Sequence, residues 1–284
     1  MGARVTQWGE SNVVEYFCRH LVALCVTYSQ PGCDEPGSNY RFAAYAGTLI
    51  QIRDNVFFLT AGHSLRELED ALQRSDVEIQ STVLADTFGW RRISDHPIPF
   101  DLKSEYLFYI DDEQEGLDFG VIALRPYYVN LLAANGMVAL SEENWIRQST
   151  VKFDGHLMLG LPAEFTSDRV SSAGEGLLSP TMFRVQRLET PPSDKLTRYQ
   201  RFIGQLDQDL ALQDLKGMSG GPIFGFSLDP EMRYWIVALQ SMWNRGRRLV
   251  FGCPIPVIGS MLTRLTDEAL STVDHGSGHS HISP

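Results

Sequence analysis

The stretch LKGMSGGPIFG, residues 215–225, places a single serine, Ser219, among glycines. Gly217 lies two residues before it, and a Gly-Gly-Pro run follows it directly. Such a stretch suits a tight turn. It also suits a nucleophile, because residues without side chains leave room for a substrate and allow backbone N–H groups to point at it. Glycine-rich turns are common, so the rest of the sequence has to decide between the two interpretations.

A serine nucleophile needs a base to take its proton and an acid to hold that base in one tautomer. His63 stands in FFLTAGHSL, where an apolar run that predicts a strand ends and a helical pattern begins. Asp118 stands in EGLDFGVIAL and opens another apolar run after an acidic loop. A carboxylate there is partly dehydrated and can accept an imidazole N–H. Considered singly, His63 could also be a histidine of the core, and Asp118 could also be a strand cap.

The motifs LTAGH, LDFGVIAL and GMSGGP, in this order, resemble those of the trypsin-like serine peptidases, which have the chymotrypsin fold. By this resemblance His63 is the base, Asp118 the acid and Ser219 the nucleophile of a catalytic triad. The backbone N–H groups of Gly217 and Ser219 would form the oxyanion hole. The resemblance covers about residues 21–265, and it implies a serine endopeptidase that forms an acyl-enzyme intermediate and needs no cofactor and no metal.

The resemblance also implies an all-β fold of two perpendicular six-stranded antiparallel β-barrels, with the site in the cleft between them. We place the first barrel, with the histidine and the aspartate, at residues 21–140 and the second, with the serine, at residues 141–255. A helical segment at residues 1–20 precedes them. A C-terminal helix at residues 256–270 and a disordered tail at residues 271–284 follow.

The hydrophobic periodicity agrees with this arrangement, because short β-type runs separated by turn signals outnumber helical runs. Strands are predicted at residues 21–29, 41–52, 55–62, 77–84, 105–110, 119–124, 151–162, 181–189, 234–243 and 247–255. One internal helix is predicted at residues 64–73, where Ser64 and Glu67 have the spacing of a capping box.

Two positions depart from the secreted members of the family that are activated by cleavage. Ser64 follows the histidine where many secreted members have a cysteine, and Met218 precedes the serine where cleaved zymogens have an aspartate. We therefore expect an intracellular, prokaryotic-type peptidase without a disulfide beside its base. Because such an enzyme would be hazardous in a cytoplasm, we expect control by an activating or target protein partner, for example in stress or antiviral defence.

The specificity pocket is assigned by resemblance alone. Counting back six residues from Ser219 gives Gln213 at the position that often forms the pocket floor, and Asp214 beside it would favour a basic substrate residue. Ser241, in IVALQSMW, would be the pocket-strand serine that hydrogen-bonds the catalytic aspartate. Gln240 is the alternative residue for the same position of the pocket strand.

Charge and hydropathy argue against nucleic-acid and membrane partners. The 284-residue chain has a formal net charge of −11, and its one dense basic cluster, NRGRR at residues 244–248, is predicted to be a solvated hairpin turn. No apolar run reaches the roughly 18 residues of a membrane-spanning helix, and the N-terminal stretch has no signal-peptide core. We therefore expect a cytoplasmic protein that acts on protein or peptide substrates.

The cysteines and the terminal histidines offer no strong metal site. None of the four cysteines belongs to a C-x-x-C pair, so free and mostly buried thiols are predicted. His275, His279 and His281 lie in the polar tail, where such spacing is usually inert. A second interpretation of the whole chain stays open: a protease-fold module whose main task is binding or regulation, with gated or negligible activity.

Overall fold

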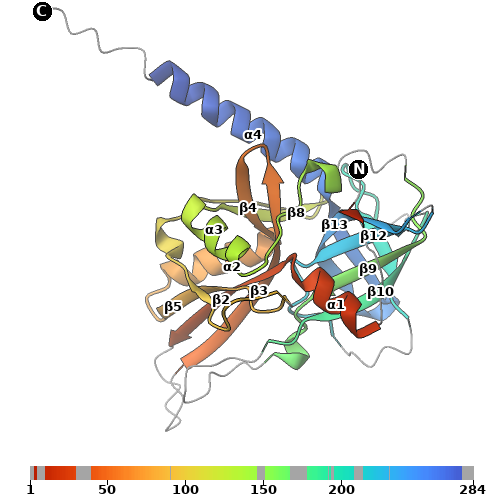
Figure 1. Cartoon of the computed structure of the whole chain (residues 1–284), viewed down its shortest axis with the longest axis horizontal. Helices are drawn as coiled ribbons and strands as arrows, with labels where there is room; N and C mark the ends of the chain where they lie inside the picture. Colours follow the sequence, from red (N-terminus) through yellow and green to blue (C-terminus); the bar gives the residue numbers. More distant parts are fainter. Residues whose placement is uncertain are drawn as a thin grey trace, which may run out of the picture.

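The computed structural model describes residues 3–4, 10–29, 40–89, 91–145, 151–166, 178–190, 192, 195–207, 214–229 and 231–276. Its body consists of two antiparallel β-sheets, one formed by the N-terminal half of the chain and the other almost entirely by the C-terminal half (Figure 1). Helices are few. The described elements therefore form a mostly β protein with two halves.

The first sheet has the strand order β6-β5-β2-β3-β4-β8-β7. Its strands are β2 (Leu21–Ser29), β3 (Tyr40–Ile52), β4 (Asn55–Thr60), β5 (Glu78–Ala85), β6 (Ile98–Pro99), β7 (Leu107–Asp112) and β8 (Leu117–Ala123). Helices α2 (Gly62–Gln73) and α3 (Pro126–Ala134) belong to the same half. One face of the sheet is filled by large aliphatic side chains, which pack with Leu65 and Leu68 of α2.

The second sheet closes on itself. Its strands are β9 (Gly155–Gly160), β10 (Thr181–Arg187), β11 (Phe202–Gln205), β12 (Pro222–Ser227), β13 (Arg233–Asn244) and β14 (Leu249–Pro254). The long strand β13 pairs with β12 along one edge and with β14 along the other, which completes a six-stranded ring. The short β1 (Ala3–Arg4) adds to β13 at Tyr234 and Arg233. Among the described residues, no pairing closes the first sheet in the same way, and that sheet has seven strands where six are predicted.

A shared hydrophobic core joins the two halves. The N-terminal helix α1 (Glu10–Cys18) inserts Phe17 between them, and its ring centroid lies 4.8 Å from that of Phe224 and 4.8 Å from that of Tyr234. Helix α4 (Ile255–Gly276) begins with the buried Ile255 and Ile258 and then extends away from the body (Figure 1). The halves are thus held against each other by apolar burial.

Most strand predictions agree with the structure, and the differences are local. Helix α3 was not predicted, although Pro126 at its first turn and Gly136 just after it are ordinary helix boundary signals. Helix α4 continues to Gly276, beyond residue 270 where the tail is expected to begin, while residues 277–284, with His279 and His281, lie outside the described residues. Strand β11 is only four residues long, too short for a clear periodic signal.

Three of the four cysteines are free and buried, as predicted: Cys18, Cys25 and Cys253. Cys33 lies outside the described residues. Among the residues that the structure describes, no helix is long and apolar enough to cross a membrane. Within the same residues, no group of three or more His, Cys, Asp or Glu side chains is placed to hold a metal ion.

Candidate active site

The pairing of two neighbouring strands brings His63 to Asp118. Thr60, the last residue of β4, lies opposite Gly120 of β8, so the chain that leaves β4 runs directly over the start of β8. His63 Nδ1 lies 2.7 Å from Asp118 Oδ2, and the backbone N–H of His63 donates to Asp118 Oδ1 over 2.9 Å. Because an ionised carboxylate only accepts, Nδ1 carries the proton and Nε2 keeps a free lone pair. The imidazole is therefore held in the tautomer that a general base requires.

The same carboxylate replaces the predicted cap of helix α2. The capping-box prediction for Ser64 and Glu67 is wrong, because the helix begins at Gly62, its N-cap is Ala61, and no side chain of the cap residue accepts a hydrogen bond. An N–H group in the first helical turn has no partner within the helix. That of His63 finds one in Asp118, which belongs to a strand far away in the sequence.

Opposing influences set the basicity of His63. Burial lowers the pKa of the imidazole, but the hydrogen bond and the charge of Asp118 raise it, and the charges of Glu67 and Asp111 raise it further. The pKa of His63 therefore lies above the ordinary value of 6.5. Its side chain is 26% exposed and that of Asp118 is 17% exposed, so solvent and substrate can reach the ring while the acid is largely covered.

Ser219 faces the same cleft as His63 but comes from the other half of the molecule. The cleft has a volume of about 600 Å³. Its lining includes Tyr28, Arg41, Phe42, Ala43, Ala44, Tyr45, His63, Ser64 and Glu67 from the first half and Leu161, Ala163, Thr166, Lys216, Gly217 and Ser219 from the second. The structure thus brings the predicted base, the predicted nucleophile and Gly217 to one cavity, with Asp118 directly behind the base.

The backbone before Ser219 has a left-handed conformation at Gly217, which glycine allows. Gly217 has φ +86°, and a Cβ there would lie 2.4 Å from the carbonyl oxygen of Leu161. The carbonyl of Lys216 accepts from Ala163 N–H over 2.7 Å. Since the C=O and N–H of one trans peptide point in opposite directions, the N–H of Gly217 points away from Ala163. Gly217 itself lines the cleft, so its amide is a candidate donor to a ligand there.

Two further side chains lie beside Asp118, and sequence reasoning missed both. Burial raises the pKa of the Cys253 thiol to about 12, while a hydrogen bond with the backbone of Asp118 acts against this shift. Arg201 is 9% exposed; burial lowers the pKa of its guanidinium, and the charges of Glu113, Asp118 and Cys253 oppose that shift. These residues come from β14 and from the residue before β11, and no local pattern links them to the aspartate.

The predicted specificity residues do not gather at the cleft. Gln213 lies outside the described residues. Asp214 is exposed, and its N–H donates to Glu164 Oε1 over 2.7 Å. Ser241 is buried, and its hydroxyl donates to the Phe251 carbonyl over 3.4 Å. Neither Asp214 nor Ser241 lines the cleft, so their roles in specificity stay predictions.

Comparisons with known proteins bear on the fold. No protein-family model matches the sequence, and no curated protein matches it. Among solved structures, the Drosophila Grass clip serine protease of the Toll pathway is 15% identical over 95% of this chain and 74% of its own, with a TM-score of 0.52. The fold is chymotrypsin-like. The predicted fold class is thereby confirmed, and at this identity the likeness shows the fold alone.

Two viral proteases are similar at a lower level. The serine protease domain of the Sesbania mosaic virus polyprotein is 12% identical over 85% of this chain and 91% of its own, with a TM-score of 0.42. The tobacco etch virus protease complexed with product is 12% identical over 88% of this chain and 77% of its own, with a TM-score of 0.41.

Proposed function

We propose that this chain is a serine endopeptidase that cleaves peptide bonds with Ser219, His63 and Asp118. One observation carries the proposal: a single carboxylate holds both the ring and the backbone of His63 in the cleft that Ser219 also lines. If His63 were only a core residue, it would not be expected to line an open cleft. If Asp118 were only a strand cap, it would not be expected to bind an imidazole. The chymotrypsin-like fold supports the proposal.

In the proposed reaction, His63 Nε2 takes the Ser219 hydroxyl proton while the oxygen attacks the substrate carbonyl. The N–H groups of Gly217 and Ser219 donate to the oxyanion, and the Asp118 carboxylate stabilises the imidazolium. His63 then gives the proton to the leaving amine, which departs and leaves an acyl-enzyme. Water, deprotonated by His63, releases the acyl group and restores the serine.

The cleft lining supports a polypeptide substrate. The lining includes the aromatic residues Tyr28 and Tyr45, and the charged Glu67 and Lys216 offer partners for polar substrate groups. Control by a protein partner in an intracellular, prokaryotic setting belongs to the same proposal. Met218, which is fully buried in an apolar cluster, supports this part, because it cannot form the ion pair that activates cleaved zymogens.

Labelling with a fluorophosphonate probe tests the proposed nucleophile. We expect the native chain to be labelled at Ser219, alone or after addition of cell extract, and Ser219→Ala to be unlabelled and about 10⁴-fold or more slower in casein hydrolysis. Ser260→Ala, which alters an exposed helix serine, is the matched control. A folded native chain that stays unlabelled in both conditions would favour the alternative, a binding or regulatory module on a protease fold.

A further inference from the structure

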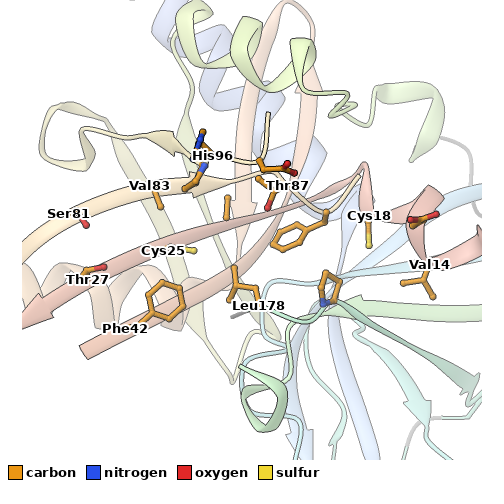
Figure 2. A pocket seen from close by; sticks show the side chains of 16 residues that line it. Val14, Cys18, Cys25, Thr27, Phe42, Ser81, Val83, Thr87, His96 and Leu178 are labelled. Carbon is orange, nitrogen blue, oxygen red and sulfur yellow. The ribbon is translucent and has the colours of Figure 1, made fainter. Parts of the chain in front are cut away.

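A second cavity, larger than the cleft, has none of the proposed catalytic residues in its lining. It has a volume of about 940 Å³, against about 600 Å³ for the cleft. Its walls come from α1, from one face of strands β2, β3 and β5, from residues 95–97 and from residues 178 and 180 (Figure 2). A cavity of this size is within the range of small-molecule sites, about 300–1,000 Å³.

Strand register explains why this face of the sheet is hollow. Thr27 of β2 lies opposite Phe42 of β3 and Ser81 of β5, and Cys25 lies opposite Val83. Side chains of alternate residues share one face of a sheet, so these residues form neighbouring rows on the cavity floor. Figure 2 shows the labelled side chains of this floor turned toward the same space.

The opposite face of the same strands is filled. There, the alternate residues are large and buried aliphatic side chains: Val22, Leu24, Val26 and Leu84. The cavity side instead carries thiol, hydroxyl and methyl groups at most floor positions. The cavity therefore results from the side-chain sizes in β2 and β5. Their bulky residues lie on one face of the sheet, and most of their residues on the other face are small and leave space.

The rim of the cavity has one carboxylate without a cation. Asp95 lies on the rim with its oxygen 2.5 Å from Arg92 Nε. Glu15 of α1 is exposed at the rim and forms no ion pair within the described part of the chain. Burial raises the pKa of the Cys18 thiol to about 12, and the negative charge of Glu15 adds to that shift, so the carboxylate lies close to a thiol of the cavity wall.

We propose that this cavity binds an amphiphile with an apolar body and a cationic end. The apolar body lies between Phe42, Val83 and Leu178, and the cationic end pairs with Glu15 at the rim. Hydroxyl groups of Thr27 and Ser81 can hydrogen-bond a polar group along the body. The net charge of −11 favours a cation over an anion at long range.

The cavity and the cleft share a lining residue, so an occupant of the cavity can regulate activity in the cleft. This part of the inference rests on the proposed function. Phe42 lines both the cavity and the cleft that holds His63 and Ser219. An occupant that displaces this ring changes the wall that a substrate meets. Coupling between two binding events is reciprocal, so substrate in the cleft must alter the affinity of the cavity by the same factor.

Binding is tested with two dyes of the same apolar group and opposite charge, dansylcadaverine and N-dansyl-6-aminohexanoate, on the Ser219→Ala chain. We expect blue-shifted fluorescence and an affinity about tenfold higher for the cationic dye, since one rim carboxylate attracts it and repels the other. Glu15→Gln should remove most of this preference. Asp70→Asn, which removes one exposed charge on α2 outside the cavity lining, should keep it.

Two further measurements decide whether the dye binds in this cavity. Ser81→Trp places a large ring at the exposed mouth and should abolish binding without loss of the thermal transition. The cationic dye should slow alkylation of Cys18 and Cys25 but not of Cys253, with each thiol read by peptide mass spectrometry. Equal binding of both dyes, or binding that survives Ser81→Trp with no protection of the thiols, overturns the site.

The coupling is tested separately on the active chain. Saturating dansylcadaverine should change kcat/KM for a peptide substrate in the native chain and leave it unchanged in Ser81→Trp. Protected thiols with an unchanged kcat/KM would overturn the regulatory role and leave the binding site in place. Because the dye assay needs no hydrolysis, failure of the proposed peptidase activity is distinguishable from failure of the site.

Discussion

The carboxylate of Asp118 has two functions at the level of single residues. One oxygen accepts the ring proton of His63, and the other accepts its backbone N–H in the first turn of α2. The two bonds restrain both the position and the rotation of the imidazole. Around them, Glu67 and Asp111 add negative charge that favours the imidazolium, and Arg201 places positive charge near the carboxylate.

Asp118→Asn should keep the fold and lower kcat/KM for peptide hydrolysis about 10⁴-fold at neutral pH, because an amide can donate to Nδ1 and stabilise the wrong tautomer. Far-UV circular dichroism checks the fold, and initial rates check the loss. Asp112→Asn, on the exposed end of β7, is the matched control. A comparable loss in Asp112→Asn would show that the acid has been assigned to the wrong turn.

The pH profile should respond to Glu67. His63 must be neutral to act as base, so activity falls as the pH drops through its raised pKa. Glu67→Gln removes a charge that stabilises the imidazolium, so the acidic limb of kcat/KM should move to lower pH. Asp70→Asn should leave the limb in place. A limb that moves upward in Glu67→Gln contradicts this account of the basicity.

At the level of elements, the turn before β12 depends on backbone conformations that glycine permits. Gly217 and Gly220 both have φ +86°, in the left-handed region. The N–H of Gly220 donates to the Gln240 carbonyl over 2.8 Å, and the Gln240 N–H donates to the Gly221 carbonyl over 2.9 Å. Strand β13 thus fixes the residues after Ser219, while the Lys216 carbonyl fixes those before it.

Gly217→Ala should reduce kcat by about 10²–10³-fold, since the added Cβ meets the Leu161 carbonyl and the amide must turn out of the cleft. Turnover and thermal unfolding are measured together. Gly155→Ala is the control, because a Cβ at Gly155 has nothing within 4 Å. Unaltered turnover in Gly217→Ala would mean that this amide does not stabilise the oxyanion.

On the scale of the whole molecule, a buried histidine links the two halves. His20 precedes β2, and its Nδ1–H donates to the Val138 carbonyl over 2.8 Å. Its Nε2 lies 2.9 Å from the hydroxyl of Tyr234 on β13. Burial lowers the pKa of His20 to about 3, and the charge of Arg19 lowers it further. The ring is therefore neutral in the fold and bridges the halves as donor and acceptor.

His20 should make the fold sensitive to acid. The unfolded chain binds this proton near pH 6.5 and the folded chain only near pH 3, so the stability is full above pH 6.5 and is lost as the pH falls toward 3. Between pH 7 and pH 5 the histidine accounts for about 2 kcal/mol of that loss. Urea unfolding at both pH values should show a smaller loss in His20→Gln. Asp86 and His156 titrate in both proteins, so equal losses would exclude His20 as the cause.

The sequence by itself determined the three motifs, their order and most strands. These features are local: alternating or apolar runs predict strands, and LTAGH, LDFGVIAL and GMSGGP are each contained in one short segment. The sequence also shows that glycines flank Ser219, and the structure adds that Gly217 and Gly220 adopt the left-handed conformation that few other residues tolerate.

Only the tertiary structure decided which partners these segments meet. Asp118 accepts the His63 N–H in the first turn of α2, although Ser64 and Glu67 have the local capping pattern, because the pairing of β4 with β8 brings the carboxylate to that N–H. Cys253 and Arg201 lie beside Asp118 only because the two halves pack together. The cavity under α1 likewise depends on register, since small residues of β2 and β5 make a hollow only when they lie side by side.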